Sequence, residues 1–167
     1  GDENFAYAES QNGNISRVNL TTLERTPARP GGGRGGGGAE AGAPALRFNW
    51  DTPIEVSRFN PAVVYVGAQQ LFRSPDRGAT WTAVSPDLTT GIDPATLPIM
   101  GAPVPPGALS RNDGSSPFAS LTSIGESPLD AQVILHLLKT SNTRRYHDPV
   151  VAGHNDLQEL SNAHAQL

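Results

Sequence analysis

The densest pattern of alternating apolar and polar positions lies between residues 47 and 88. Short runs rich in β-branched and aromatic residues follow one another there, with Pro, Asn, Asp and Gly between them. Runs of this kind predict β-strands, at 54–57, 63–68, 71–73 and 80–85. Because the segments between the runs suit tight turns, we predict an antiparallel meander.

A meander this small cannot bury both of its faces alone, and units of its size normally stack on neighbours. The chain contains evidence of a neighbour when it is compared with itself. Shifted by 70 residues, SRFNPAVVY (57–65) aligns without gaps with SPLDAQVIL (127–135). Both segments have a strand end, a polar turn and an apolar strand. The repeat predicts a second unit that begins near Ser120.

The other segments differ in composition. Two alternating runs around Asn12-Gly13 predict a hairpin. The glycine-rich stretch after it cannot bury enough apolar surface to offset its chain entropy, which predicts disorder. We call each of the stacked sheet units a blade, as in β-propellers. We divide the chain into six segments: a hairpin that ends one blade (1–26), a disordered Gly/Pro-rich insertion (27–46), a complete blade (47–88), a Pro/Gly-rich loop (89–119), the start of a further blade (120–136) and an irregular or weakly helical tail (137–167).

One motif in the predicted blade resembles a known repeat. Residues 74–81 read SPDRGATW, which follows the spacing S-x-D-x-G-x-T-W. This motif resembles the Asp box of BNR-repeat β-propellers, a family that includes sialidases, the sortilin ectodomain and xyloglucanase-type glycoside hydrolases. The wider string YVGAQQLFRSPDRGATWTAVSPDLT (65–89) is similar to bacterial sortilin-like proteins that are often labelled glycosyl hydrolases.

The resemblance covers residues 4–23 and 46–134 and implies an all-β fold. The chain would form a partial β-propeller, with one complete four-stranded blade and parts of its neighbours. The second unit lacks a box, because Arg144, Tyr146 and Asp148 stand where Ser, Asp and Gly would be expected. The tail beyond about residue 135 does not resemble the family, and the sequence leaves open whether it is native or out of frame.

The chemistry of the box predicts a structural role. A carboxylate at a hairpin accepts hydrogen bonds from backbone N–H groups of its own turn, and a glycine adopts positive φ there. A threonine then begins the next strand, and a tryptophan ring packs on an adjoining sheet. The box residues are Ser74, Asp76, Gly78, Thr80 and Trp81. Such a box identifies a fold and not a reaction.

Glycoside hydrolysis requires two placed carboxylates. Asp51 and Asp113, each near the start of a predicted inner strand, are the best pair, although solvated loop carboxylates are the simpler interpretation.

Histidines in the tail, at 147 and 154, stand near acidic residues but match no metal-binding spacing, so we predict no metal and no cofactor.

Aromatic residues near the predicted strands allow two interpretations. Phe48, Trp50 and Tyr65 have the chemistry to stack on sugar rings, but we favour packing between blades.

Composition and charge exclude further classes of function. The net charge of −4 disfavours a nucleic-acid partner, the absence of Cys excludes thiol chemistry, and no apolar run is long enough to span a membrane.

The resemblance implies two functions. The first is a structural and binding module of a sortilin-like propeller, whose partners are the neighbouring blades of a parent chain and a protein, peptide or carbohydrate ligand. The alternative is part of a glycoside hydrolase whose catalytic carboxylates lie largely outside this chain. The chain alone is not expected to be an enzyme. The resemblance also implies a periplasmic or extracellular parent protein, although the chain shows no signal peptide and suggests a fragment or mature product.

Overall fold

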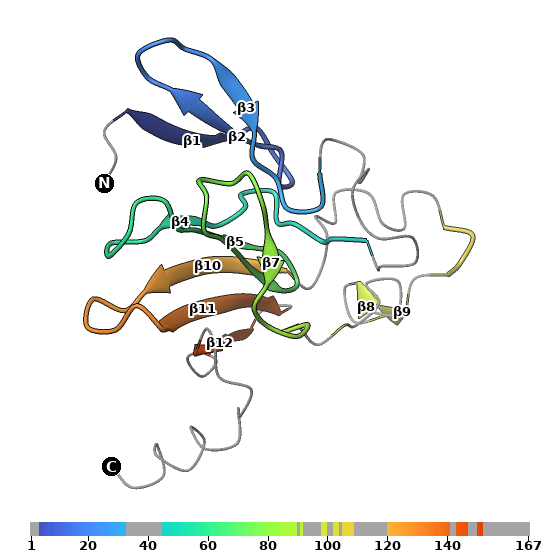
Figure 1. The fold of residues 1–167 in the computed structure, drawn as a ribbon. Helices are drawn as coiled ribbons and strands as arrows, with labels where there is room; N and C mark the ends of the chain where they lie inside the picture. Colours follow the sequence, from blue (N-terminus) through green and yellow to red (C-terminus); the bar gives the residue numbers. More distant parts are fainter. Residues whose placement is uncertain are drawn as a thin grey trace, which may run out of the picture.

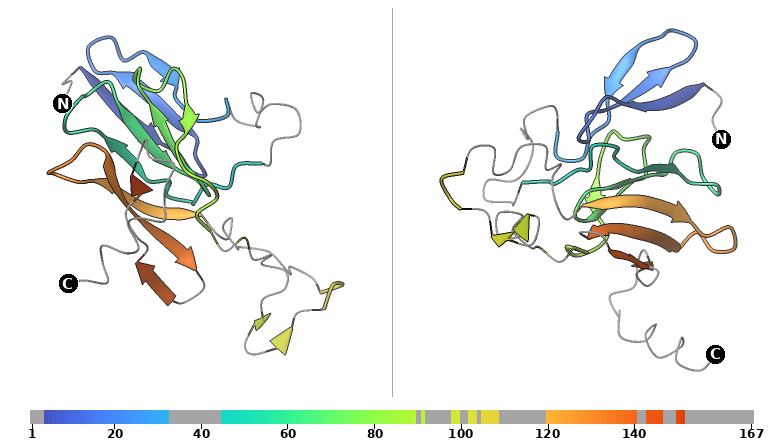
Figure 2. Two further views of the ribbon diagram at one scale, coloured as in Figure 1. Left: turned by 60° about the horizontal axis from the view of Figure 1, so that its bottom comes forward. Right: turned by 180° about the vertical axis from the view of Figure 1, so that it is seen from behind.

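The computed structural model describes residues 4–32, 45–89, 91, 98–99, 102–103, 105–108, 120–140, 143–146 and 150–151. These residues form β-strands and no helix, which confirms the all-β prediction. Three small antiparallel sheets follow one another in chain order, and the second lies between the first and the third (Figures 1 and 2). No closed sheet forms among the described residues.

The first sheet contains β1 (Phe5–Glu9), β2 (Ile15–Asn19) and β3 (Arg25–Pro27), in that order. The predicted turn joins β1 and β2, where Asn12 and Gly13 both have positive φ. The hairpin expected over 1–26 is therefore extended by a third strand. Sequence analysis missed β3 because all three of its residues are exposed and carry no apolar alternation.

The second sheet has the predicted meander, in the order β4-β5-β6-β7. Its strands are β4 (Ile54–Val56), β5 (Val64–Gly67), β6 (Leu71–Ser74) and β7 (Thr82–Ala83). The last strand is shorter than the predicted 80–85, because Thr80 belongs to the preceding turn and is hydrogen-bonded to Asp76.

The hairpin that opens the third sheet repeats the geometry of the hairpin that opens the second. The third sheet contains β10 (Leu121–Glu126), β11 (Val133–Thr140), β12 (Thr143–Tyr146) and β13 (Val150–Val151). Val56 pairs with Val64 in the second sheet, and the residues 70 positions later, Glu126 and Ile134, pair in the third. The turn hydrogen bonds also correspond, since Val63 N–H donates to Asn60 O and Val133 N–H donates to Asp130 O. The internal repeat is thus a structural repeat.

Two segments expected to be irregular contain strands. The tail predicted at 137–167 includes the end of β11, all of β12 and all of β13. The loop predicted at 89–119 includes a pair of two-residue strands, β8 (Pro98–Ile99) and β9 (Ala102–Pro103). The sequence pattern did not predict that β11 continues past residue 136, because Leu137 and Leu138 interrupt the alternation of apolar and polar residues. The remainder of the tail, where weakly helical structure was also expected, lies outside the described residues.

The predicted bounds of the insertion, 27–46, include residues at both ends that are packed in the structure. Ala28 is part of the core and Pro30 is fully buried. A Cβ built on Gly31 would lie 3.0 Å from the Leu46 side chain, so the two flanks of the insertion meet. Composition could not show this, because small residues become core residues only where another sheet covers them.

Alternating side chains of the second sheet form two apolar clusters, one on each face. Toward the first sheet, the cluster contains Ile15, Ala28, Phe48, Val66, Ala68 and Phe72. Toward the third sheet, it contains Val63, Tyr65, Leu71, Leu121 and Ile134. We refer to these as the first junction and the second junction.

Candidate functional site

The predicted Asp box forms a hydrogen-bonded turn between β6 and β7. Ser74 Oγ donates to Asp76 Oδ1 at 2.8 Å, and Gly78 N–H donates to Ser74 Oγ at 2.8 Å. Thr80 donates to both carboxylate oxygens of Asp76, from its N–H at 2.8 Å and from its hydroxyl at 2.6 Å. These donors, first the Thr80 side chain and then its N–H, lower the pKa of Asp76 to about 2.

Two further box residues connect the turn to the first sheet. Gly78 has φ of +85°, and a Cβ on it would lie 2.8 Å from the Ala28 Cβ, so the position suits only glycine. Trp81 packs against the first junction but remains half-exposed. The hydrogen bonds that the structure shows for the Asp76 carboxylate are made to Ser74 and Thr80, within its own turn. The side-chain hydrogen bonds of Ser74, Asp76 and Thr80 are thus internal to this turn, and no reacting centre is seen around Asp76 among the described residues.

The described residues do not include both members of the carboxylate pair considered for hydrolysis. Asp51 is exposed, and Asp113 lies outside the described part of the chain. His147 and His154 also lie outside it. Among the described residues, no three His, Cys, Asp or Glu side chains gather as a metal site.

The aromatic residues divide between packing and exposure. Phe48 and Tyr65 are each 2% exposed and pack in the first and second junctions, which agrees with packing between sheets. Trp50 is 51% exposed, so it does not pack between the described sheets.

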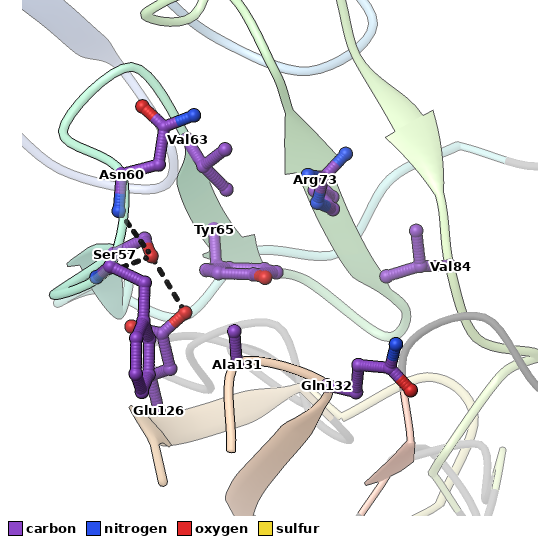
Figure 3. A pocket seen from close by; sticks show the side chains of 10 residues that line it. Ser57, Asn60, Val63, Tyr65, Arg73, Val84, Glu126, Ala131 and Gln132 are labelled. Carbon is purple, nitrogen blue, oxygen red and sulfur yellow. Dashed lines mark hydrogen bonds between the residues drawn. The ribbon is translucent and has the colours of Figure 1, made fainter. Parts of the chain in front are cut away.

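A groove of about 380 Å³ lies at one end of the second junction, where the β4–β5 and β10–β11 turns project side by side (Figures 1 and 3). Its size is in the range of ligand pockets. Its lining is Ser57, Phe59, Asn60, Val63, Tyr65, Arg73, Val84, Glu126, Ala131 and Gln132. No signal in the sequence pointed to this groove, although the two turns that form it align in the 70-residue repeat.

A buried carboxylate closes one end of the groove. Glu126, at the end of β10, is 4% exposed. Its Oε1 accepts a hydrogen bond from Ser57 Oγ at 2.8 Å, and its Oε2 accepts one from Arg58 N–H at 2.6 Å. Ser57 Oγ in turn accepts from Phe59 N–H, at 3.2 Å. This clamp holds the β4–β5 turn against the third sheet and so shapes the groove.

The opposite end of the groove carries a guanidinium group. Arg73 on β6 pairs across the sheet with Tyr65 on β5, and Figure 3 shows both side chains within the groove. Arg73 is half-buried. The ion pair found in the described part of the chain joins Arg47 to Asp87 at 2.8 Å, and Arg73 has no ion partner among these residues.

Comparisons with known proteins identify no relative of this chain. No family model, curated protein or solved structure matches it. The fold and site thus define an all-β protein of three stacked antiparallel sheets with a groove between the second and third. No helix within the described ranges is long and apolar enough to cross a membrane.

Proposed function

We propose that this chain is part of a BNR/Asp-box β-propeller and serves as a structural and binding module for a protein or peptide partner. The stacking of three antiparallel sheets in chain order supports the propeller, as does the repeat at 70 residues. The box turn between β6 and β7 has the residues that the resemblance implies. By the same resemblance, the parent protein is periplasmic or extracellular.

The observation that carries the binding role is the groove. It is large enough for a side chain of a partner, and its walls come from two sheets that the Glu126 clamp holds together. Apolar groups (Phe59, Val63 and Val84) line it beside polar ones, which is typical of recognition sites. No described arrangement of carboxylates gives comparable support to hydrolysis.

Selection of peptides tests this proposal. A random-peptide library is selected on the purified full chain, and the selected peptides are synthesised and measured by isothermal titration calorimetry. Ala131→Trp places a large ring in the groove and should weaken binding at least about tenfold. Leu129→Trp is the matched control, because Leu129 is on the same turn, is 91% exposed and does not line the groove.

Retention of binding by Leu129→Trp together with its loss in Ala131→Trp would support the groove as the binding site. Equal losses in the two variants, peptides that bind elsewhere, or a library that yields no peptide would contradict the proposal. Amide NMR spectra of both variants establish that the fold is intact.

A further inference from the structure

We propose that the groove recognises a carboxylate side chain of an acidic peptide, and that Arg73 is the residue that binds it. This inference rests on the proposed binding function and specifies its ligand. It depends on three features of the groove: an unneutralised guanidinium, the position of the neighbouring acidic groups, and an edge strand beside the opening.

The first feature is the free charge. A guanidinium is always protonated at physiological pH and pairs with carboxylates through two parallel N–H donors. Arg73 is half-buried, where bulk water screens charge less than at a fully exposed site. Within the described ranges it has no ion partner, whereas Arg47 is paired with Asp87. An anion that enters the groove would therefore meet an unpaired cation.

The second feature is that no carboxylate among the described residues forms an ion pair with Arg73, and Asp130, in the turn beside the groove, accepts a hydrogen bond from Gln132 N–H. Glu126 lies at the other end of the groove (Figure 3), and both of its oxygens accept hydrogen bonds from Ser57 and Arg58. Glu55 is opposite Tyr65 on β4, two strands away from Arg73. At a strand spacing of about 4.8 Å, that places the two backbones about 10 Å apart.

The third feature favours a peptide over an acidic sugar. β7 is the last strand of the second sheet, its two residues are exposed, and the following residue, Val84, lines the groove. An edge strand offers unpaired backbone groups to an extended peptide. The apolar side chains of Val84, Val63 and Phe59 suit the aliphatic neighbours of an acidic residue.

The test uses the isotopically labelled full chain and three capped peptides of equal length, in which Ala alternates with Glu, Gln or Lys. Dissociation constants come from NMR titrations. The Glu peptide should shift the Arg73 Nε–Hε resonance and the amides of Ala131 and Gln132. It should bind at least about tenfold more tightly than the Gln peptide, as charge-assisted hydrogen bonds imply. The Lys peptide should not bind the groove.

Two variants assign the effect to Arg73. Arg73→Gln should weaken binding of the Glu peptide at least about tenfold, and Arg73→Lys should give an intermediate loss because the fork of donors is removed. Arg25→Gln removes an exposed arginine of the first sheet that does not line the groove, so it should change affinity less than about twofold. If Arg73→Gln does not fold, the Arg73 resonance in the unaltered chain still decides the question.

Several results would overturn the inference: equal affinity for the Glu and Gln peptides, an equal loss in Arg25→Gln, an unmoved Arg73 resonance, or tighter groove binding by an oligoglucuronate than by the Glu peptide. Its failure is distinguishable from failure of the proposed function. If neutral library peptides bind the groove and Arg73→Gln does not weaken their binding, the proposed binding function stands and the inference of carboxylate recognition fails.

Discussion

The two faces of the second sheet are covered in different ways. At the first junction, Phe48, Val66 and Phe72 form an apolar layer, and the box glycine, Gly78, brings the turn close to Ala28. At the second junction, the apolar cluster borders the groove, which Val63 and Tyr65 also line. A buried carboxylate lies at one end of this groove, and an arginine with no ion partner among the described residues lies at the other. The comparison indicates that the first junction supplies stability, while the second gives up part of its packing for an accessible site.

The largest expected effect is at the first junction. Phe48→Ala removes a ring that is 2% exposed and lies 4.6 Å from the Arg29 guanidinium. It should lower the free energy of unfolding by about 3–5 kcal/mol, measured by urea denaturation. Peptide affinity per folded molecule should stay unchanged. A stable Phe48→Ala protein with a damaged groove would reverse the roles of the two junctions.

Trp81→Ala should have the next largest effect. Because Trp81 is only half-buried, we expect a loss of about 2 kcal/mol in the free energy of unfolding. Trp50→Ala serves as the control, since Trp50 is 51% exposed and should cost less than about 0.5 kcal/mol. If the two variants had equal denaturation midpoints, the packing role of the box tryptophan would be refuted.

The clamp at the second junction should contribute less. Glu126→Gln replaces a buried acceptor of two hydrogen bonds with an amide that can accept through one oxygen only. The free energy of unfolding should fall by about 1–2 kcal/mol. A double-mutant cycle with Ser57→Ala should show that the two losses are not additive. Glu24→Gln, at an exposed position, is the control, and strict additivity in the cycle would contradict the clamp.

The smallest effect concerns the charge of Asp76. Its pKa is lowered to about 2 in the folded chain, against about 3.9 for an unperturbed Asp. A lowered carboxyl pKa stabilises the fold above the unfolded-state value, and this contribution is lost as the pH falls through the folded-state value. The denaturation midpoint of Asp76→Asn should therefore lie below that of the unaltered chain at pH 7, and the gap should narrow between about pH 4 and pH 2. A gap independent of pH would show that the charge contributes nothing.

Local features of this protein could be predicted from the sequence alone. The meander over the second sheet and the turn at Asn12-Gly13 follow from β-branched runs and turn residues that act over a few positions. The pairing shared by the second and third sheets was already present in the 70-residue alignment. The box hydrogen bonds depend on residues no more than four positions apart, so their spacing was sufficient to predict them.

Other features depend on which sheets meet. The burial of Ala28 and the exposure of Trp50 are set by a neighbouring sheet and not by residue type. The same is true of the groove, since Glu126 reaches Ser57 across 69 positions and Arg73 borders a turn of the third sheet. The hydrophobic effect is non-directional, so the sequence does not specify which distant segments pack together. The tertiary arrangement decides which apolar side chains are covered and which charged side chains have no ion partner among the described residues.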